Sequence, residues 1–227
     1  MLYTVDHVKD NIRNRDGRRV FYLGRGDQLT SSARDYLCWN RIEILPAAQA
    51  GVQVFRLLDG GTLPGKPEHM THLNAQVLVT KDHPRIRFRG KLDTLESELI
   101  LCQLELPSLT QPLGQILALA RKIMACDVLE EPLKDTSLCG LEEDQIRKRS
   151  HIPQQYYGQP HFMPEHTDGE AVVRLNRLRC IARETEVAAV CAFRDDRGDP
   201  TRPDLLQAMN RMSSMLYLLM IEQKAKL

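Results

Sequence analysis

From residue 84 to the end of the chain, apolar side chains recur every three or four residues, the spacing of one face of an α-helix. The first such segment starts at Pro84, which suits the first turn of a helix, and Asp82 is predicted to cap it. Its apolar face contains Phe88, Leu92, Leu95, Leu99 and Cys102. Further helices are predicted at residues 112–129, 140–151, 169–194 and 203–227. The pattern predicts a mainly α protein, an antiparallel bundle of about five helices.

The chain before this bundle has a different pattern, that of a small α/β region. A helix is predicted at residues 29–39, with Thr30 or Ser31 as its cap. Short strands are predicted at residues 18–24, 40–45 and 52–58. The bundle is therefore expected to carry a small N-terminal α/β appendage.

Residues 59–67 contain three glycines and two prolines, a composition typical of a linker. This segment predicts where the two regions meet. We expect a small N-terminal α/β region with its linker at residues 1–66 and a helical-bundle domain at residues 67–227.

Charge and composition exclude several classes of function. The 227 residues carry a formal net charge of +1, so no global field attracts nucleic acid or an anionic membrane. No apolar run is long enough to span a bilayer, and the first residues lack the apolar core of a signal peptide. The six cysteines contain no CxxC pair, which is typical of reduced thiols. We expect a cytoplasmic protein that binds neither nucleic acid nor membrane.

Polar side chains form stripes beside the apolar faces of the predicted helices. Arg179, Arg183 and Glu186 follow one another at i, i+4 and i+7. The first and last helices repeat this spacing with Arg89, Asp93 and Glu96 and with Asn210, Ser213 and Tyr217. Such stripes are most often solvated faces, and this reading stays open for each of them. Two arginines one turn apart are also well suited to clamp a polyphosphate.

Other chemistry finds little support in the sequence. No Gly-rich loop followed by Lys-Ser or Lys-Thr is present to hold phosphates. The pairs His69 with His72 and His161 with His166 have no cysteine close by, and such pairs are more often coincidental than ligand sets. No motif indicates a Ser or Cys nucleophile. We therefore predict no metal site in the protein itself.

Three segments resemble the ATP:cob(I)alamin adenosyltransferases, in the order expected for that family. They are "KDHPRIRFRGKLDTLES" at residues 81–97, "RCIARETE" at 179–186 and "AMNRMSSMLY" at 208–217. The closer likeness is to the ethanolamine-utilization type, which "THLNAQVLVTKDHPR", "GLEEDQIRKRSH" and the N-terminal "LTSSARDYLCWNRIEI" also resemble. The resemblance implies transfer of the 5′-deoxyadenosyl group of ATP to cob(I)alamin, with release of triphosphate. The adenosylcobalamin formed would serve ethanolamine ammonia-lyase.

The family pattern also implies roles for individual residues. Arg179 and Arg183 would bind the polyphosphate of ATP, and Asp93 would pair with Arg179 to orient it. Glu186 would position a partner or the Mg²⁺ that accompanies ATP. Asn210 would contact the nucleotide, and Lys81 would be a further phosphate contact.

Cobalamin is expected to meet the segment at residues 151–166, where an apolar side chain would displace the lower axial ligand of cobalt. Phe162 is the first choice, because it lies ahead of a proline as the corresponding phenylalanine does in relatives. Its distance from Arg179 in the sequence is one residue longer than in those relatives. Tyr156 and Tyr157 remain alternatives, and Phe162 could instead anchor the loop to the bundle.

The sequence departs from the family in two places. The Gly-rich phosphate loop of the wider superfamily is absent, as it is from the ethanolamine type. The His and Cys metal motif of many ethanolamine-type members is also missing, since residues 60–73 contain no cysteine. A metal requirement beyond Mg²⁺ with ATP is therefore not expected.

The resemblance further implies partners. We expect a homo-oligomer, either a dimer or a trimer, because related enzymes complete their sites across subunit boundaries. The resemblance also implies association with ethanolamine ammonia-lyase, a corrinoid reductase and a bacterial microcompartment. A non-catalytic cobalamin or nucleotide carrier of the ethanolamine pathway is the main alternative, and a helical protein–protein module with solvated stripes is a third.

Overall fold

The structure, a computed structural model, describes residues 2–15, 17–24, 26–47, 55–63 and 65–227. Its residues form two compact units, Met1–Glu68 and His69–Leu227. The boundary expected after residue 66 lies close to this division. The mainly α fold with a small α/β part agrees with the sequence prediction. No helix in the described part of the chain is both long and apolar enough to cross a bilayer.

The first unit contains short strands around two helices. Its elements are β1 (Leu2–Tyr3), α1 (Val5–Asp10), β2 (Arg13–Arg15), β3 (Arg18–Leu23), β4 (Gln28–Leu29), α2 (Ser31–Trp39), β5 (Glu43–Pro46), β6 (Phe55–Leu57) and β7 (Thr62–Leu63). Strand β3 pairs with β2 antiparallel and with β5 parallel, whereas β6 and β7 form a hairpin. Helix α2 is capped by Thr30, whose hydroxyl accepts a hydrogen bond from Ala33 N. Of the strand predicted at 52–58, residues 52–54 lie outside the described part of the chain.

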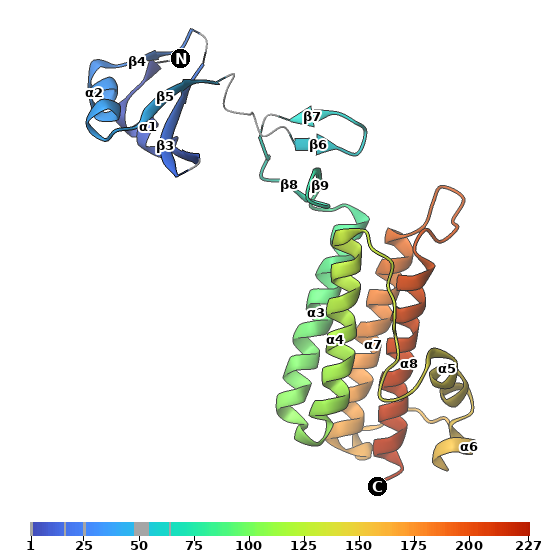
Figure 1. Cartoon of the computed structure of the whole chain (residues 1–227). Helices are drawn as coiled ribbons and strands as arrows, with labels where there is room; N and C mark the ends of the chain where they lie inside the picture. The colour runs from blue at the N-terminus through green and yellow to red at the C-terminus, as the bar shows by residue number, and fades with distance from the viewer. Residues whose placement is uncertain (1, 16, 25, 48–54, 64) are drawn as a thin grey trace. The chain divides into compact units, whose positions relative to one another are not determined.

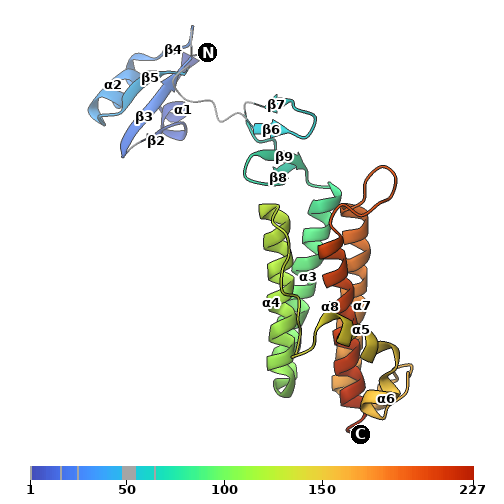
Figure 2. The same ribbon diagram turned by 45° about the vertical axis from the view of Figure 1, so that its right-hand side comes forward.

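The second unit begins with a hairpin, β8 (Met70–His72) and β9 (Val77–Thr80), and continues into the bundle. Its long helices are α3 (Pro84–Glu105), α4 (Thr110–Leu129), α7 (Gly169–Ala192) and α8 (Pro203–Lys224). Helix α3 packs against α4 and α7, and α8 packs against α7 and α4. Each of these neighbouring pairs is antiparallel (Figures 1 and 2). The predicted antiparallel bundle is thereby confirmed.

The helices bury the apolar faces that the spacing predicted. Phe88, Leu92, Leu95 and Leu99 of α3 are fully buried, and Leu175, Leu178, Ala182 and Ala189 of α7 are buried with them. The cap of α3 differs from the prediction. His83, not Asp82, is the N-cap, and its Nδ1 accepts a hydrogen bond from Arg85 N at 3.2 Å. Burial lowers the pKa of His83, which favours the neutral imidazole that can accept this bond.

A long crossover, residues 130–168, connects α4 to α7 and packs along one side of the bundle. It contains α5 (Glu143–His151), α6 (Pro153–Tyr157) and a 3₁₀ turn at His166–Asp168. Helices α5 and α6 both pack against α8, and the figures show them beside its lower half (Figures 1 and 2). Helix α6 was not predicted, because a single turn leaves too little periodicity to recognise.

The crossover is tied to the start of α8 through Asp204. Its carboxylate accepts hydrogen bonds from Arg202 Nε at 3.0 Å, Arg202 Nη2 at 2.9 Å and Leu133 N at 2.9 Å. These contacts, led by the Arg202 side chain, lower the pKa of Asp204 to about 2. A depressed carboxylate pKa stabilises the fold above the pKa of the unfolded chain, about 3.9. That stabilisation is lost as the pH falls from about 4 to about 2.

We expect Asp204→Asn to lower the free energy of unfolding at pH 7 by about 2 kcal/mol, and the difference from the wild type to shrink below pH 4. Urea unfolding at a series of pH values measures both. Asp199→Asn, in the neighbouring loop, is the matched control and should change little, because its side chain is exposed. An undiminished difference at pH 2 would contradict this assignment.

Candidate functional site

A cavity of about 320 Å³ lies where α5, α7 and α8 meet. Helix α7 contributes Arg179, Arg183 and Glu186. The remaining lining residues come from α5 and α8 and are Ser150, His151, Asn210, Ser213, Ser214 and Tyr217. The structure therefore brings together four of the residues assigned to ATP from the sequence. It does so because positions i, i+4 and i+7 of α7 share the helical face that meets α5 and α8.

Arg179 lines the cavity, and only part of its guanidinium group is hydrogen-bonded within the protein. Its Nη2 donates a hydrogen bond to Asn176 Oδ1 at 3.1 Å, and its guanidinium carbon lies 5.9 Å from the centre of the Tyr217 ring. Its Nε is buried and forms no hydrogen bond among the described residues. A buried donor without an acceptor is costly. An anion could satisfy it only after the side chain shifts to turn this Nε toward the cavity that Arg179 lines.

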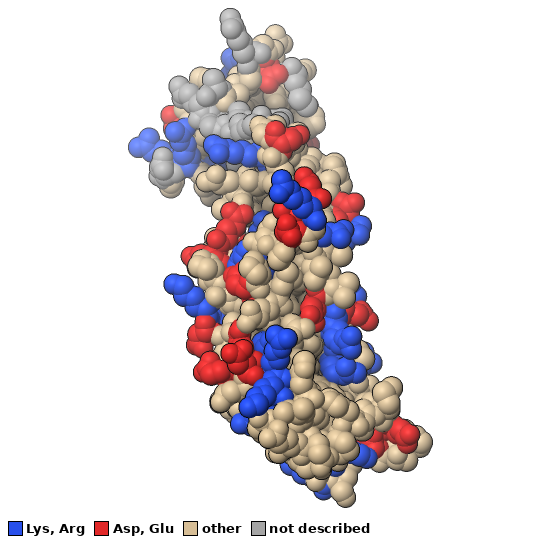
Figure 3. All heavy atoms as spheres, turned by 90° about the vertical axis from the view of Figure 1, so that its right-hand side faces the viewer, with Lys and Arg blue, Asp and Glu red and all other residues tan. Residues whose placement is uncertain are grey.

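Arg183 lies one turn further along α7 and is exposed. It forms no hydrogen bond or ion pair with any residue that the structure describes. On the face of the bundle in Figure 3, acidic and basic side chains are interspersed. The attraction for an anion is therefore local to the cavity, as the small net charge indicated.

Glu186 is the only carboxylate among the described residues that line the cavity. Its Oε1 accepts a hydrogen bond from Asn210 Nδ2 at 2.8 Å. The hydroxyls of Ser213 and Ser214 each donate to the Asn210 carbonyl at 3.0 Å, which holds them along the same face of α8. Two cations, one carboxylate and several hydroxyls would suit a phosphate chain with a divalent cation.

The expected pair between Asp93 and Arg179 is not formed, although the structure describes both residues. Helix α7 presents a different face to α3, where Arg177 binds Glu98 at 2.7 Å. Arg177 and Arg179 are two positions apart, which places them on nearly opposite sides of the helix. Asp93 lies exposed on α3 and does not line the cavity. Helical spacing alone does not tell which neighbour each face meets.

Lys81 lies in the turn between β9 and α3 and also does not line the cavity. Its backbone N–H donates to the His69 carbonyl at 2.9 Å. The structure thus places this expected phosphate contact away from the arginine pair of its own chain.

The side chains assigned to cobalamin lie on or after α6. Phe162 is half-buried against the bundle, with Lys224 Nζ 5.8 Å from its ring centre. This is the geometry of a loop anchor, the alternative left open for it. Tyr157 packs on the same core and has a buried hydroxyl without a hydrogen bond among the described residues. Tyr156 is 37% exposed and lies under Arg149.

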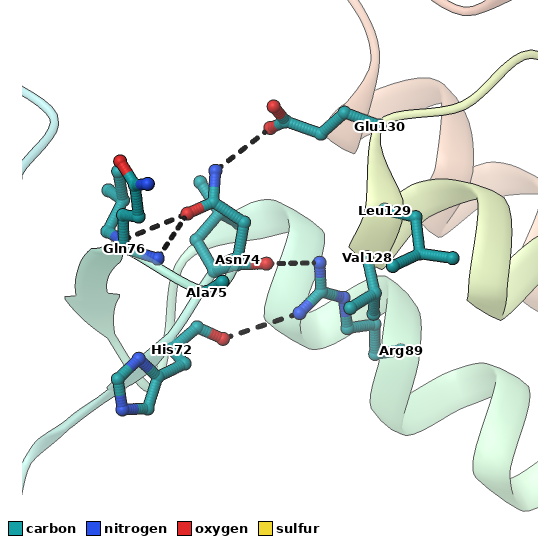
Figure 4. A pocket seen from close by; sticks show the side chains of 10 residues that line it. His72, Asn74, Ala75, Gln76, Arg89, Val128, Leu129 and Glu130 are labelled. Carbon is teal, nitrogen blue, oxygen red and sulfur yellow. Dashed lines mark hydrogen bonds between the residues drawn. The ribbon is translucent and has the colours of Figure 1, made fainter.

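A larger cavity, of about 760 Å³, lies between the β8–β9 hairpin and the end of α4 (Figure 4). Arg89 reaches across it to the carbonyls of His72 and Leu73, at 3.4 and 2.7 Å. The Arg89 Nε also lies 2.6 Å from the fully buried carboxylate of Asp127, which binds Arg85 Nε at 2.8 Å as well. The charged groups of Arg89 and Glu130 here are already paired, so this cavity mainly joins the hairpin to α3 and α4.

The polar stripe of α3 therefore does not line the cavity of its own chain. Arg89 binds Asp127 of α4, and Glu96 binds Arg121 of the same helix at 3.2 Å. Asp93 is exposed, whereas through Arg89 and Glu96 the stripe links α3 to α4. The sequence interpretation that grouped it with the stripes of α7 and α8 was wrong for these two residues.

The histidines form no metal site within the described residues, where no three His, Cys, Asp or Glu side chains gather. His161 instead contacts Tyr217, with 2.7 Å between Nδ1 and the hydroxyl oxygen. Sequence analysis missed Ser150, His151 and Ser214 as lining residues. Ser150 and His151 end the segment "GLEEDQIRKRSH", whose packing on α8 no local pattern reveals, and Ser214 lies in "AMNRMSSMLY", where only its neighbour Ser213 was singled out.

Comparison with known proteins adds to this geometry. The sequence model of the family described as cobalamin adenosyltransferase matches residues 64–223. Two curated relatives are each named corrinoid adenosyltransferase EutT: that of Salmonella typhimurium strain LT2 is 40% identical over 162 residues, and that of Escherichia coli strain K12 is 39% identical over 157. The alignments cover 71% and 69% of this chain but 61% and 59% of the relatives, so the chain spans about three fifths of their length. No solved structure matches it.

Proposed function

Because the chain belongs to the cobalamin adenosyltransferase family, we propose that it transfers the 5′-deoxyadenosyl group of ATP to cob(I)alamin and releases triphosphate. One observation carries the proposal. Two arginines one turn apart line the same cavity, and the buried Nε of one of them has no hydrogen-bond partner among the described residues. The names of the two relatives support the same activity and connect it with a corrinoid.

The reaction needs an electrostatic site more than a base. Co(I) of the reduced corrinoid attacks C5′ of ATP with its electron pair, a Co–C bond forms, and the C5′–O bond breaks toward the triphosphate. Cobalt is thereby oxidised to Co(III), and the leaving oxygen gains negative charge. Guanidinium groups held in place before the reaction stabilise that charge without reorganising. Arg179 and Arg183 would supply this stabilisation.

Glu186 and Asn210 would bind next to the same phosphate chain. A Mg²⁺ ion in such sites is held by one or two carboxylates together with substrate phosphates, and Glu186 fits that requirement as a lining carboxylate. When bound, the ion would neutralise phosphate charge. Asn210 fixes one oxygen of Glu186 through its amide and leaves the other side of the carboxylate for a ligand.

The corrinoid would approach from the crossover, where Tyr156, Tyr157 and Phe162 lie. The exposed Met163 and Tyr156 give this segment apolar surface. An apolar side chain at the lower face of the corrinoid would keep water and the axial ligand from cobalt. Phe162 stays our first choice, and using it requires the ring to leave its packing under Lys224.

We also propose a homo-oligomer, a dimer or a trimer, in which Asp93 and Lys81 of one copy approach the cavity of another. The carboxylate of Asp93 is exposed and forms no ion pair with any described residue of its own chain. The adenosylcobalamin product would serve ethanolamine ammonia-lyase, with a corrinoid reductase as electron supplier, in the cytoplasm or in a microcompartment.

Mixing two inactive variants tests the shared site. Asp93→Ala and Arg183→Ala should each be inactive alone, whereas a refolded equimolar mixture should regain about a quarter of wild-type activity if dimers form at random. The recovered activity comes from sites in which both residues are intact. Full activity of Asp93→Ala, or no recovery in mixtures shown to exchange subunits, would refute a role for Asp93 across the interface.

The phosphate product tests the reaction type. Phosphorus-31 NMR of a reaction with ATP and chemically reduced cobalamin should show tripolyphosphate, formed in equal amount to the alkylated corrinoid. ADP with phosphate, or AMP with pyrophosphate, would instead indicate hydrolysis and contradict the proposed transfer.

A further inference from the structure

Tyr217 connects the cavity to the crossover. Its ring lies under Arg179, and its hydroxyl meets His161 Nδ1 at 2.7 Å. The rings of Tyr217 and His161 are also stacked, with centroids 5.8 Å apart and 15° between their planes. His161 does not line the cavity but belongs to residues 158–165, the segment that contains Phe162. A contact between residues far apart in sequence thus joins the proposed phosphate site to the proposed corrinoid segment.

The hydrogen bonds of His161 have a defined direction. Its Nε2 lies 3.1 Å from the His151 carbonyl, which can only accept, so Nε2 carries a proton and donates. In the neutral imidazole Nδ1 must then accept, and Tyr217 donates its hydroxyl proton to it. Burial raises the pKa of Tyr217, opposed by Arg179, which keeps the hydroxyl protonated and able to donate.

Hydrogen bonds from backbone N–H groups hold the two ends of the 158–165 segment, from Gly158 N to the Gln154 carbonyl at 3.1 Å and from Glu165 N to Asp168 Oδ2 at 2.9 Å, and fewer contacts hold its middle. Phe162 rests against the core, Gln159 is half-buried, and Met163 is 85% exposed. A stretch with few buried contacts opens at low free-energy cost, so the hydrogen bonds of His161 contribute to the order of the middle of the segment.

We propose that Tyr217 and His161 are positioning residues that couple binding of a polyphosphate in the cavity to ordering of residues 158–165. An anion that binds Arg179 fixes the guanidinium on the Tyr217 ring. A fixed ring keeps the hydroxyl aligned with His161, and the segment is held in place. By linkage, an ordered segment raises the affinity of the cavity for the polyphosphate by the same factor. This inference rests on the proposed polyphosphate site. It adds that the phosphate chain binds first and that residues 158–165, the proposed corrinoid segment, become ordered afterwards.

Hydrogen exchange of the full chain, with and without sodium tripolyphosphate, tests the coupling. In the wild type, tripolyphosphate should slow amide exchange within residues 158–165 about fivefold, the effect expected of one additional stable hydrogen bond. Tyr217→Phe keeps the ring but removes the hydroxyl, and His161→Ala removes the acceptor. Both should abolish the slowing. His166→Gln, an exposed histidine next to the segment, is the matched control and should behave as the wild type.

Calorimetric binding of tripolyphosphate separates the two roles of Tyr217. Tyr217→Phe should weaken binding by no more than about fivefold, the coupling factor, because the ring still supports Arg179. Tyr217→Leu removes the ring as well and should weaken it about tenfold or more. Unchanged affinity in a folded Tyr217→Leu variant would show that the ring has no part in binding and would contradict the proposal.

The outcomes distinguish this inference from the function it rests on. Tight tripolyphosphate binding with unchanged exchange in the wild type, or with equal slowing in Tyr217→Phe, would overturn the coupling and leave the site intact. Absence of tripolyphosphate binding in the wild type would overturn both. Tyr217→Phe changes a single oxygen, so it keeps the test decisive even if His161→Ala does not fold.

Discussion

Arg183→Ala should lower the rate of adenosyl transfer by about 10²- to 10³-fold while leaving the fold intact. The rate falls because the triphosphate gains charge as the C5′–O bond breaks, and a preorganised guanidinium that met this charge is gone. Stability is unaffected because Arg183 is exposed and forms no ion pair with any described residue. Steady-state kinetics and thermal unfolding measure the two effects separately.

Arg177→Ala is the control for that variant. Arg177 is an arginine on the same helix as Arg183. It binds Glu98 at 2.7 Å and does not line the cavity. We expect its activity to stay within about twofold of the wild type, since exposed ion pairs contribute little. Equal losses in the two variants would show that charge on α7, and not the cavity, determines the rate.

Asp127→Ala should lower the free energy of unfolding by about 3 to 5 kcal/mol. The carboxylate is fully buried and binds both Arg85 and Arg89, and the Asp127 carbonyl also accepts from Arg85 at 2.7 Å. Removing the carboxylate leaves the largely buried guanidinium groups of Arg85 and Arg89 without the anion that they share. Urea unfolding at neutral pH measures the change.

Glu130→Gln tests whether this loss belongs to the buried charge. Glu130 lies in the same network, with its Oε1 3.4 Å from Arg85 Nη1, but its side chain is 54% exposed. The change should cost no more than about 0.5 kcal/mol. A loss below about 1 kcal/mol for Asp127→Ala would contradict the view that this cluster holds the hairpin and α4 to α3.

The bundle could be predicted from the sequence because each long helix has an apolar face at regular spacing. Four residues of the candidate site could also be predicted, because each lies at a fixed offset from the apolar face of its helix: Arg179, Arg183, Glu186 and Asn210. Their convergence then follows from the packing of α7 against α8. The resemblance added which ligand such a group of residues holds.

Other features depend on contacts that no local pattern encodes. Helical spacing does not show which face of α7 meets α3. That face contains Arg177, so Asp93 and Arg179 do not pair within one chain. The buried triad of Arg85, Arg89 and Asp127 looked like ordinary charged positions. His161 and Tyr217 meet only because the crossover folds back onto α8.

The formation of adenosylcobalamin tests the central claim most directly. The full chain is incubated anaerobically with ATP, Mg²⁺ and chemically reduced cobalamin, and the visible spectrum is followed over time. We predict that the spectrum of cob(I)alamin is replaced by that of adenosylcobalamin, that the change requires ATP, and that Arg183→Ala slows it. A folded protein that leaves the cob(I)alamin spectrum unchanged in the presence of ATP would contradict the account.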